Sequence, residues 1–163
     1  MRLFGITGWK NTGKTGLTTR LVAEFTARGL TVSTLKHAHH SVDVDQPGTD
    51  SFRHRAAGAQ QVLLASQNRW ALMSELNGAA EPDLDQLLAQ MAPVDLILVE
   101  GFKRARHAKI ETHRAAANQP LIAPGDPTIR AVASDTPLAI DRPLFDLDDT
   151  AAIADFILSE TAP

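Results

Sequence analysis

The sequence contains no cysteine, and it also lacks other features that would define its class. Without cysteine, disulfides and thiolate metal sites are excluded. No apolar run is long enough to span a membrane, and the first strand is expected so close to Met1 that there is no room for a signal peptide. A net charge of -3 argues against a broad nucleic-acid footprint. These absences predict a cytoplasmic protein that binds neither nucleic acid nor membrane.

A complete phosphate-binding loop is present near the N-terminus. Residues 8–15 are Gly-Trp-Lys-Asn-Thr-Gly-Lys-Thr, which matches G-x-x-x-x-G-K-[ST]. The motif predicts a nucleoside triphosphate site, because backbone N–H groups of such a loop wrap the polyphosphate. Lys14 would reach the β- and γ-phosphates, and the Thr15 hydroxyl would bind Mg²⁺. The residues expected to contact the nucleotide here are Gly8, Lys10, Asn11, Thr12, Gly13, Lys14, Thr15 and Gly16.

The remainder of the chain alternates between strand and helix patterns. This alternation, with the loop after the first strand, predicts an α/β fold of the P-loop NTPase type: one domain, 1–163, with a mostly parallel, doubly wound sheet flanked by helices. Strands around Trp70 and Lys109 are candidates for an antiparallel extension of the sheet across a dimer. Strands are expected at 3–7, 31–36, 61–65, 70–74, 94–99, 109–113 and 129–133, and helices after Lys14, at 50–57, at 83–91 and after Asp149.

A second acidic group is predicted for the metal. Residues 96–101 form a short apolar strand that ends in Glu100-Gly101, the form of a Walker B motif. Ligands bind at the carboxyl ends of strands in open α/β sheets. Glu100 is therefore expected to bind Mg²⁺, directly or through water, or to orient an attacking water.

The polar segment 36–45 follows the second strand and has three interpretations. It could be a switch-like loop in which Asp45 or Asp43 senses the γ-phosphate or its metal. It could be a mobile surface loop. It could also be a transition-metal site of imidazoles and carboxylates, with the histidines His37, His39 and His40 as ligands.

Two further segments bear on the ligand. The basic run 103–109 follows Glu100 and could contact phosphates, an acidic partner or only solvent. No lysine of the chain lies in the [NT]-K-x-D signature by which many GTPases bind guanine. Asp135, at the end of the strand 129–133, could accept hydrogen bonds from guanine instead, or it could belong to a plain turn.

These motifs together resemble the MobB family, the adapter proteins of molybdopterin-guanine dinucleotide biosynthesis. The resemblance covers nearly the whole chain and rests on the phosphate loop and on the blocks at 36–51, 65–73, 95–103 and 131–135. The block with three histidines and the ending Glu-Gly-Phe-Lys at 100–103 are the more specific parts.

The resemblance implies a homodimer that binds GTP with Mg²⁺ and hydrolyses GTP weakly. It implies as partner the MobA-type molybdenum cofactor guanylyltransferase, which joins GMP to molybdopterin, and contact with molybdopterin itself is left open. Carried over by position, Gly13, Lys14 and Thr15 bind phosphates and Mg²⁺, Glu100 acts at the metal or the water, and Asp45 is a catalytic and metal candidate of the switch type. Trp9 occupies the position of an extra signature lysine found in related GTPases, so that role is not transferred.

Two other functions remain open from the residues. One is a metal-delivery GTPase that uses His37, His39 and His40. The other is a small-molecule kinase, which also needs a phosphate loop and for which Arg104 and Arg106 would have to supply the lid.

Overall fold

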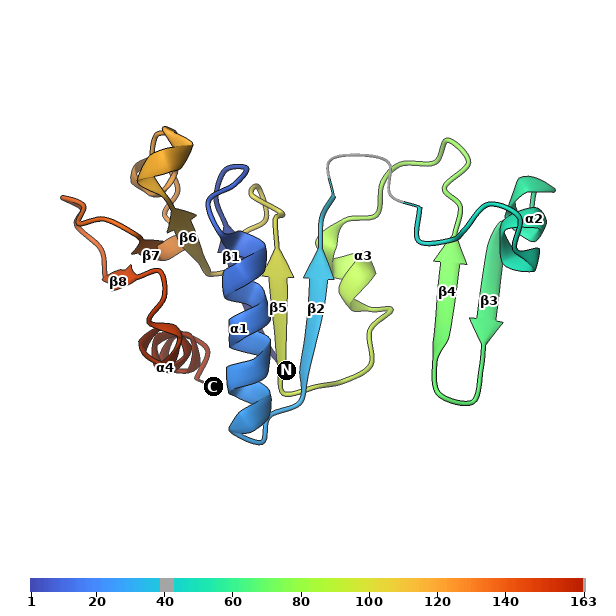
Figure 1. Ribbon diagram of the computed structural model, residues 1–163, viewed down its shortest axis with the longest axis horizontal. Helices are drawn as coiled ribbons and strands as arrows, with labels where there is room; N and C mark the ends of the chain where they lie inside the picture. Colours follow the sequence, from blue (N-terminus) through green and yellow to red (C-terminus); the bar gives the residue numbers. More distant parts are fainter. Residues whose placement is uncertain (39–42, 163) are drawn as a thin grey trace. The chain divides into compact units, whose positions relative to one another are not determined.

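The computed structural model describes residues 1–38 and 43–162, and the chain divides into two compact units. The first unit comprises Met1–His37 and Met91–Pro163, and the second comprises Ala38–Gln90. Figure 1 shows the elements of both units. The phosphate loop lies in the first unit.

The first unit is built on a six-stranded sheet in which every neighbouring pair is parallel. Its strand order is β2-β5-β1-β6-β7-β8, so β1 is central and its neighbours come from much later in the chain. Together with the flanking helices, this confirms the predicted fold class. The strands are β1 (Arg2–Thr7), β2 (Val32–Lys36), β5 (Leu96–Glu100), β6 (Lys109–His113), β7 (Ile129–Ser134) and β8 (Leu144–Asp146).

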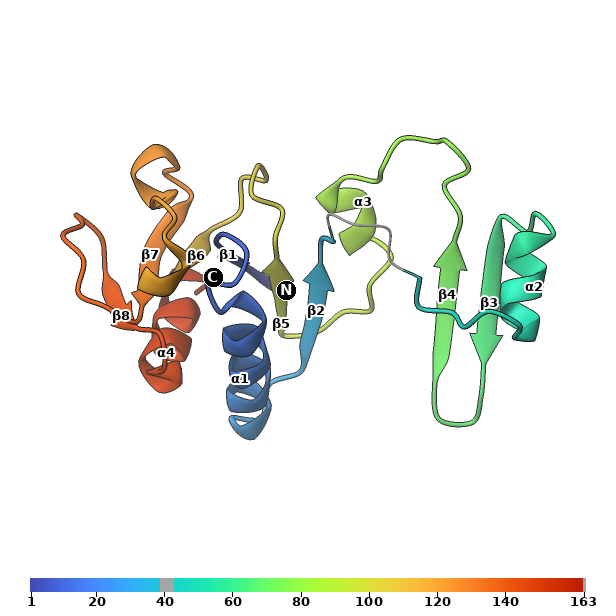
Figure 2. The same ribbon diagram turned by 45° about the horizontal axis from the view of Figure 1, so that its top comes forward.

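Two helices, α1 (Lys14–Ala27) and α4 (Thr150–Glu160), lie side by side against the sheet (Figures 1 and 2). Apolar residues recur at helical spacing in α1, and this stripe is buried against alternate residues of the strands. The shared core contains Phe4, Ile6, Leu17, Leu21, Phe25, Leu96, Leu98, Ile110, Ala131, Ala133, Leu147, Ile153, Ala154 and Ile157. Burial of this core fixes the start of α1, and therefore the loop before it.

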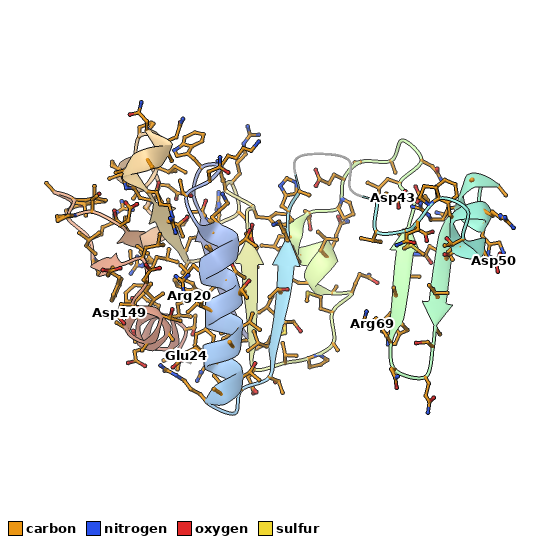
Figure 3. All side chains as sticks on the ribbon, in the orientation of Figure 1. Arg20, Glu24, Asp43, Asp50, Arg69 and Asp149 are labelled. Atoms are coloured by element: carbon orange, nitrogen blue, oxygen red, sulfur yellow. The ribbon has the colours of Figure 1, made fainter. Side chains whose placement is uncertain are left out.

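Polar contacts also hold α1 to the segment that leads into α4. The Arg20 side chain donates to the Leu147 carbonyl oxygen at 2.6 Å and to Thr150 Oγ1 at 3.0 Å. Asp149 caps α4 as predicted, by accepting from the Ala152 N–H. Arg20 and Asp149 are labelled in Figure 3.

The segment after β6 forms two short 3₁₀ helices, η1 (Ala115–Ala117) and η2 (Ala123–Gly125). Apolar residues of η2 and β7 form a separate cluster around Ala123, Ile129 and Val132. The buried Glu111 side chain of β6 accepts hydrogen bonds from the N–H groups of Ile122 and Ala123 at 2.8–3.0 Å. This carboxylate therefore anchors the irregular segment between β6 and β7.

The second unit contains α2 (Asp50–Ala56), the antiparallel pair β3 (Gln61–Ala65) and β4 (Trp70–Ser74), and α3 (Leu84–Leu88). A capping box between Asp83 and Gln86 starts α3, and the helix is capped by Ala89. The predicted helix 83–91 is therefore too long.

Two strand predictions need correction. The strand at Lys109–His113 is not an antiparallel extension: β6 pairs in parallel with both β1 and β7 inside the sheet. Its sequence alternates little because both of its faces are covered. The edge strand β8 was not predicted, since three residues carry too short a pattern. Within the part of the chain described, no helix has the length and apolar character needed to cross a bilayer.

Candidate functional site

The phosphate loop joins the end of β1 to the start of α1, and its backbone requires its glycines. Gly8 has φ +142° and Gly13 has φ +97°, which are conformations that side chains with a Cβ rarely adopt. Asn11 also lies at positive φ, at 65°, a region that asparagine tolerates better than most residues. The predicted strand, loop and helix thus occur in register.

A buried pair of hydroxyl groups holds the loop to the neighbouring strand β6. Thr12 Oγ1 lies 2.8 Å from Thr112 Oγ1 and donates to the Trp9 carbonyl oxygen at 2.9 Å. Thr112 Oγ1 in turn lies 3.2 Å from the Thr7 carbonyl oxygen. Both threonines are almost completely buried, so these bonds are shielded from water. The Thr12 side chain thus supports the loop, and its expected contact with nucleotide stays a prediction.

Lys14 lies over the loop that precedes it. Its ammonium donates to the Gly8 carbonyl oxygen at 3.0 Å and to the Trp9 carbonyl oxygen at 2.5 Å. Burial lowers the pKa of Lys14, Glu100 opposes that change, and the charges of Lys103 and Lys36 add to it. An anion beside Lys14 would oppose this lowering of the pKa, because it would stabilise the charged ammonium.

Glu100 and Thr15 meet at the carboxyl end of β5. Thr15 Oγ1 donates to Glu100 Oε1 at 3.0 Å, and Lys36 Nζ lies 3.1 Å from the same carboxylate oxygen. Glu100 is only 7% exposed. A hydroxyl and a carboxylate are the oxygen ligands that Mg²⁺ prefers, and the Lys36 ammonium already stands beside both as a cation. The donor set therefore fits Mg²⁺, with Thr15 and Glu100 as the residues that would hold it.

A cavity of about 490 Å³ lies at this edge of the sheet. Apart from Gly8 and Thr12, the residues predicted in the loop line it, and so does Glu100. Arg114, which the sequence analysis missed, lines it as well, and its Nε lies 3.1 Å from the position a Cβ on Gly13 would take. The lining residues are Lys10, Asn11, Gly13, Lys14, Thr15, Gly16, Glu100 and Arg114. With three cationic side chains and one acid, this cavity suits a polyanion.

The sequence contained a signal for Arg114 that was not used. Arg114 directly follows β6, and Lys36 is the last residue of β2, so both stand at the carboxyl ends of parallel strands. That is the position from which Glu100 was predicted.

Asp45 lies in the second unit. Its Oδ1 accepts from Thr49 Oγ1 at 3.0 Å and from Ser51 Oγ at 2.9 Å, and its Oδ2 faces Arg55 Nε at 3.3 Å. Burial acts to raise the pKa of Asp45, but these hydrogen bonds outweigh it and hold the pKa below its usual value. Arg55 also binds Asp43 and Glu75. The metal and switch role of Asp45 stays a prediction.

The other predicted residues have structural contacts. Asp135 follows β7, and its carboxylate accepts from the Ala115 N–H at 2.9 Å, which starts η1. Its role in guanine binding also stays a prediction. From the basic run, Lys103 places its ammonium 4.1 Å from the centre of the Trp9 ring, a cation–π contact with the phosphate loop. Trp9 Nε1 donates to the Pro120 carbonyl oxygen at 2.7 Å.

The histidine cluster is described only in part. The His37 ring contacts the Phe102 ring at a tilt of 45°, with 4.8 Å between centroids, while His39 and His40 lie outside the described residues. The α2 helix that follows is capped by Thr49. Across 1–38 and 43–162, no three or more His, Cys, Asp or Glu side chains are grouped so as to hold a metal ion.

Several known proteins are similar to this chain over most of its length. The adapter proteins of molybdopterin-guanine dinucleotide biosynthesis from Escherichia coli K12 and Haemophilus influenzae Rd are each 45% identical to this chain, over 96% and 95% of its length and 91% and 86% of theirs. The crystal structure of Bacillus subtilis MobB superposes with a TM-score of 0.76 at 25% identity, covering 99% of this chain and 98% of that one. The MobB homologue of Bacillus stearothermophilus gives a TM-score of 0.70 at 26% identity, with the same coverage.

The family assignment rests on most of the chain. Residues 3–135 match the family described as MobB, molybdopterin guanine dinucleotide synthesis protein B. That range contains the phosphate loop, Glu100 and Arg114. The chain therefore belongs to the MobB family.

Proposed function

We propose that this chain is a cytoplasmic, GTP-binding adapter in the biosynthesis of molybdopterin-guanine dinucleotide. The observation that carries the nucleotide part is the cavity in which the phosphate loop, Lys14, Thr15 and Glu100 meet. The adapter part is supported by relatives that carry this name and match over most of the chain.

Each lining residue has a distinct task in this proposal. The loop's N–H groups and the start of α1 bind the phosphates. Lys14 exchanges two carbonyl acceptors for phosphate oxygens, and Arg114 adds a second cation beside Gly13. Mg²⁺, when bound by Thr15 and Glu100, supplies charge neutralisation on the phosphates.

The same geometry supports a proposal of slow hydrolysis. Among the residues that the structure describes, Glu100 is the one acidic side chain that lines the cavity, and it is engaged with Thr15 and Lys36. A carboxylate committed to the metal is not free to orient an attacking water. We therefore propose weak GTPase activity in the isolated protein, with GTP serving mainly as ligand or as signal to the partner.

The partner in this proposal is the MobA-type guanylyltransferase, and the adapter would present GTP or a nucleotide-dependent surface to it. A complex of the two proteins is expected in sedimentation velocity with GTP and Mg²⁺. Absence of a complex with both GTP and GDP at micromolar concentrations would contradict the adapter part.

We further propose a homodimer that uses the β3–β4 hairpin. Leu63 and Leu72 are directly paired across the strands and are 61% and 44% exposed, and Trp70 is 67% exposed. A two-stranded hairpin with an uncovered apolar face is marginal alone, and a second copy would cover it. Trp70→Glu is expected to give monomers in sedimentation equilibrium. The control Leu144→Glu changes an exposed leucine of β8 and is expected to leave dimers.

The nucleotide part is tested by calorimetry with GTP and ATP in Mg²⁺. Lys14→Ala is expected to weaken GTP binding by roughly 100-fold, the loss of charge-assisted bonds worth about 3 kcal/mol. Arg130→Ala is the control, because Arg130 is exposed on β7 and pairs with Glu160 away from the cavity residues. Equal affinity for ATP, or a preference for it, would contradict guanine recognition through Asp135 and favour a kinase.

A further inference from the structure

Three polar groups form a closed triangle at the proposed metal position. Lys36 Nζ lies 3.1 Å from Glu100 Oε1 and 3.3 Å from Thr15 Oγ1, and those two oxygens are 3.0 Å apart. The backbone enforces the first contact, because Lys36 is the register partner of Glu100 in the parallel pair β2–β5. The triangle therefore follows from the pairing of β2 with β5 at this edge of the sheet.

The ammonium and a metal ion would compete for the same oxygens. Glu100 is nearly buried, and the Lys36 ammonium lies within ion-pair distance of its Oε1. A Mg²⁺ ion held by Thr15 and Glu100 would share these oxygens with the Lys36 ammonium, and the two cations would repel each other. Metal binding therefore requires Lys36 to move.

The structure provides room for that movement. Lys36 lines a second cavity of about 340 Å³, which shares Thr15 and Glu100 with the first. Its other walls include the hydroxyl-bearing side chains Thr18 and Thr19 of α1. The Lys36 side chain is 56% exposed, so it can leave Glu100 without unpacking the core.

We propose that Lys36 is a tethered cation that competes with Mg²⁺ for Glu100 and Thr15. The inference rests on the proposed nucleotide function, which it deepens. Without metal, Lys36 neutralises Glu100 and holds the two oxygens together. With metal, the ammonium swings into the second cavity. Lys36 thereby sets the Mg²⁺ concentration at which the nucleotide site assembles.

The test is the Mg²⁺ dependence of binding of a fluorescent GTP analogue. Lys36→Met keeps the length of the side chain and removes its charge, and it is expected to lower the half-saturating Mg²⁺ concentration about fivefold, in line with a partly exposed ion pair. Lys36→Arg is expected to stay near the wild-type value. The matched control is Lys103→Met, which also removes a cation that acts on Lys14 but has no contact with Thr15 or Glu100.

An unchanged or higher Mg²⁺ requirement in Lys36→Met would overturn the inference. An equal decrease of the half-saturating Mg²⁺ concentration in Lys103→Met would also overturn it, because the effect would then come from the overall positive charge around the cavity. Binding of the GTP analogue in EDTA reports on the proposed function separately. If the wild type binds no GTP, the inference is tested by measuring the Mn²⁺ affinity of the protein alone by electron paramagnetic resonance. Tighter Mn²⁺ binding by Lys36→Met than by the wild type supports the competition, and equal binding refutes it.

Discussion

Gly8→Ala is expected to be one of the most damaging single-methyl changes in the first unit. A Cβ on Gly8 would lie 2.6 Å from the Thr112 carbonyl oxygen and 2.7 Å from the hydroxyl oxygens of both Thr112 and Thr12. Carbonyl oxygens of a central strand cannot move away as a flexible side-chain end can. The loop itself would have to shift, and the hydroxyl pair that holds it would separate.

The magnitude follows from two effects. A residue with a Cβ at φ +142° carries roughly 1–3 kcal/mol of backbone strain. Overpacking against buried groups adds about 1–3 kcal/mol. We expect a loss of about 4 kcal/mol in the free energy of unfolding, which corresponds to a decrease of roughly 10 °C in Tm for a chain of this size.

Two other glycines separate these effects. Gly29 has φ +83° with open space around it, so Gly29→Ala carries backbone strain alone and should cost about 1 kcal/mol. Gly125 has neither a positive φ nor a close neighbour, and Gly125→Ala should be neutral or stabilising by about 0.5 kcal/mol. Thermal unfolding by circular dichroism ranks the three variants. If Gly8→Ala unfolds at the same temperature as Gly29→Ala, the reasoning from close approach is refuted.

Three further outcomes are expected. Burial and the charge of Lys109 lower the pKa of His107 to about 4 from 6.5, so the unfolded chain binds more protons between these values and stability falls as the pH drops from 6.5. Between pH 7 and pH 5, the free energy of unfolding of His107→Phe, measured in urea, should therefore fall by about 1 kcal/mol less than that of the wild type. This value is discounted because the ring is partly exposed. Arg114→Met should weaken GTP binding about tenfold in calorimetry, whereas an undiminished affinity would exclude Arg114 from the phosphate site. Glu100→Gln should raise the half-saturating Mg²⁺ concentration at least roughly tenfold without lowering Tm, and an unchanged requirement would place the metal elsewhere.

The parts of the site that were predictable are those that local sequence rules determine. The phosphate loop has fixed spacing, and its glycines are required by backbone conformation at Gly8 and Gly13. Glu100 was found because a continuous apolar run marks a buried parallel strand and ligands lie at its carboxyl end. Both rules act within a few residues of the feature they predict.

The parts that were missed depend on which strands become neighbours. Arg114 and Lys36 reach the site because β6 and β2 end at the same sheet edge as β1 and β5. The direction of β6 depends on the crossover through the loop after Glu100, which carries no periodic pattern. The strand 109–113 itself was predicted, but its buried polar residues Glu111 and Lys109 concealed that it lies inside the sheet, because they bond to the later segments at Ala123 and Thr128.

The polar side chains of the proposed nucleotide site already have hydrogen-bonding partners within the protein. Lys14 bonds to loop carbonyls, and Glu100 bonds to both Thr15 and Lys36. Nucleotide binding must therefore replace existing bonds, so the net gain per contact is smaller than for an unpaired cation. An adapter that has to release or transfer its nucleotide benefits from such an exchange, because affinity stays moderate while the loop keeps its shape. Variants that free a site group from its internal partner, as Lys36→Met does for Glu100, are therefore expected to bind the metal or nucleotide more tightly.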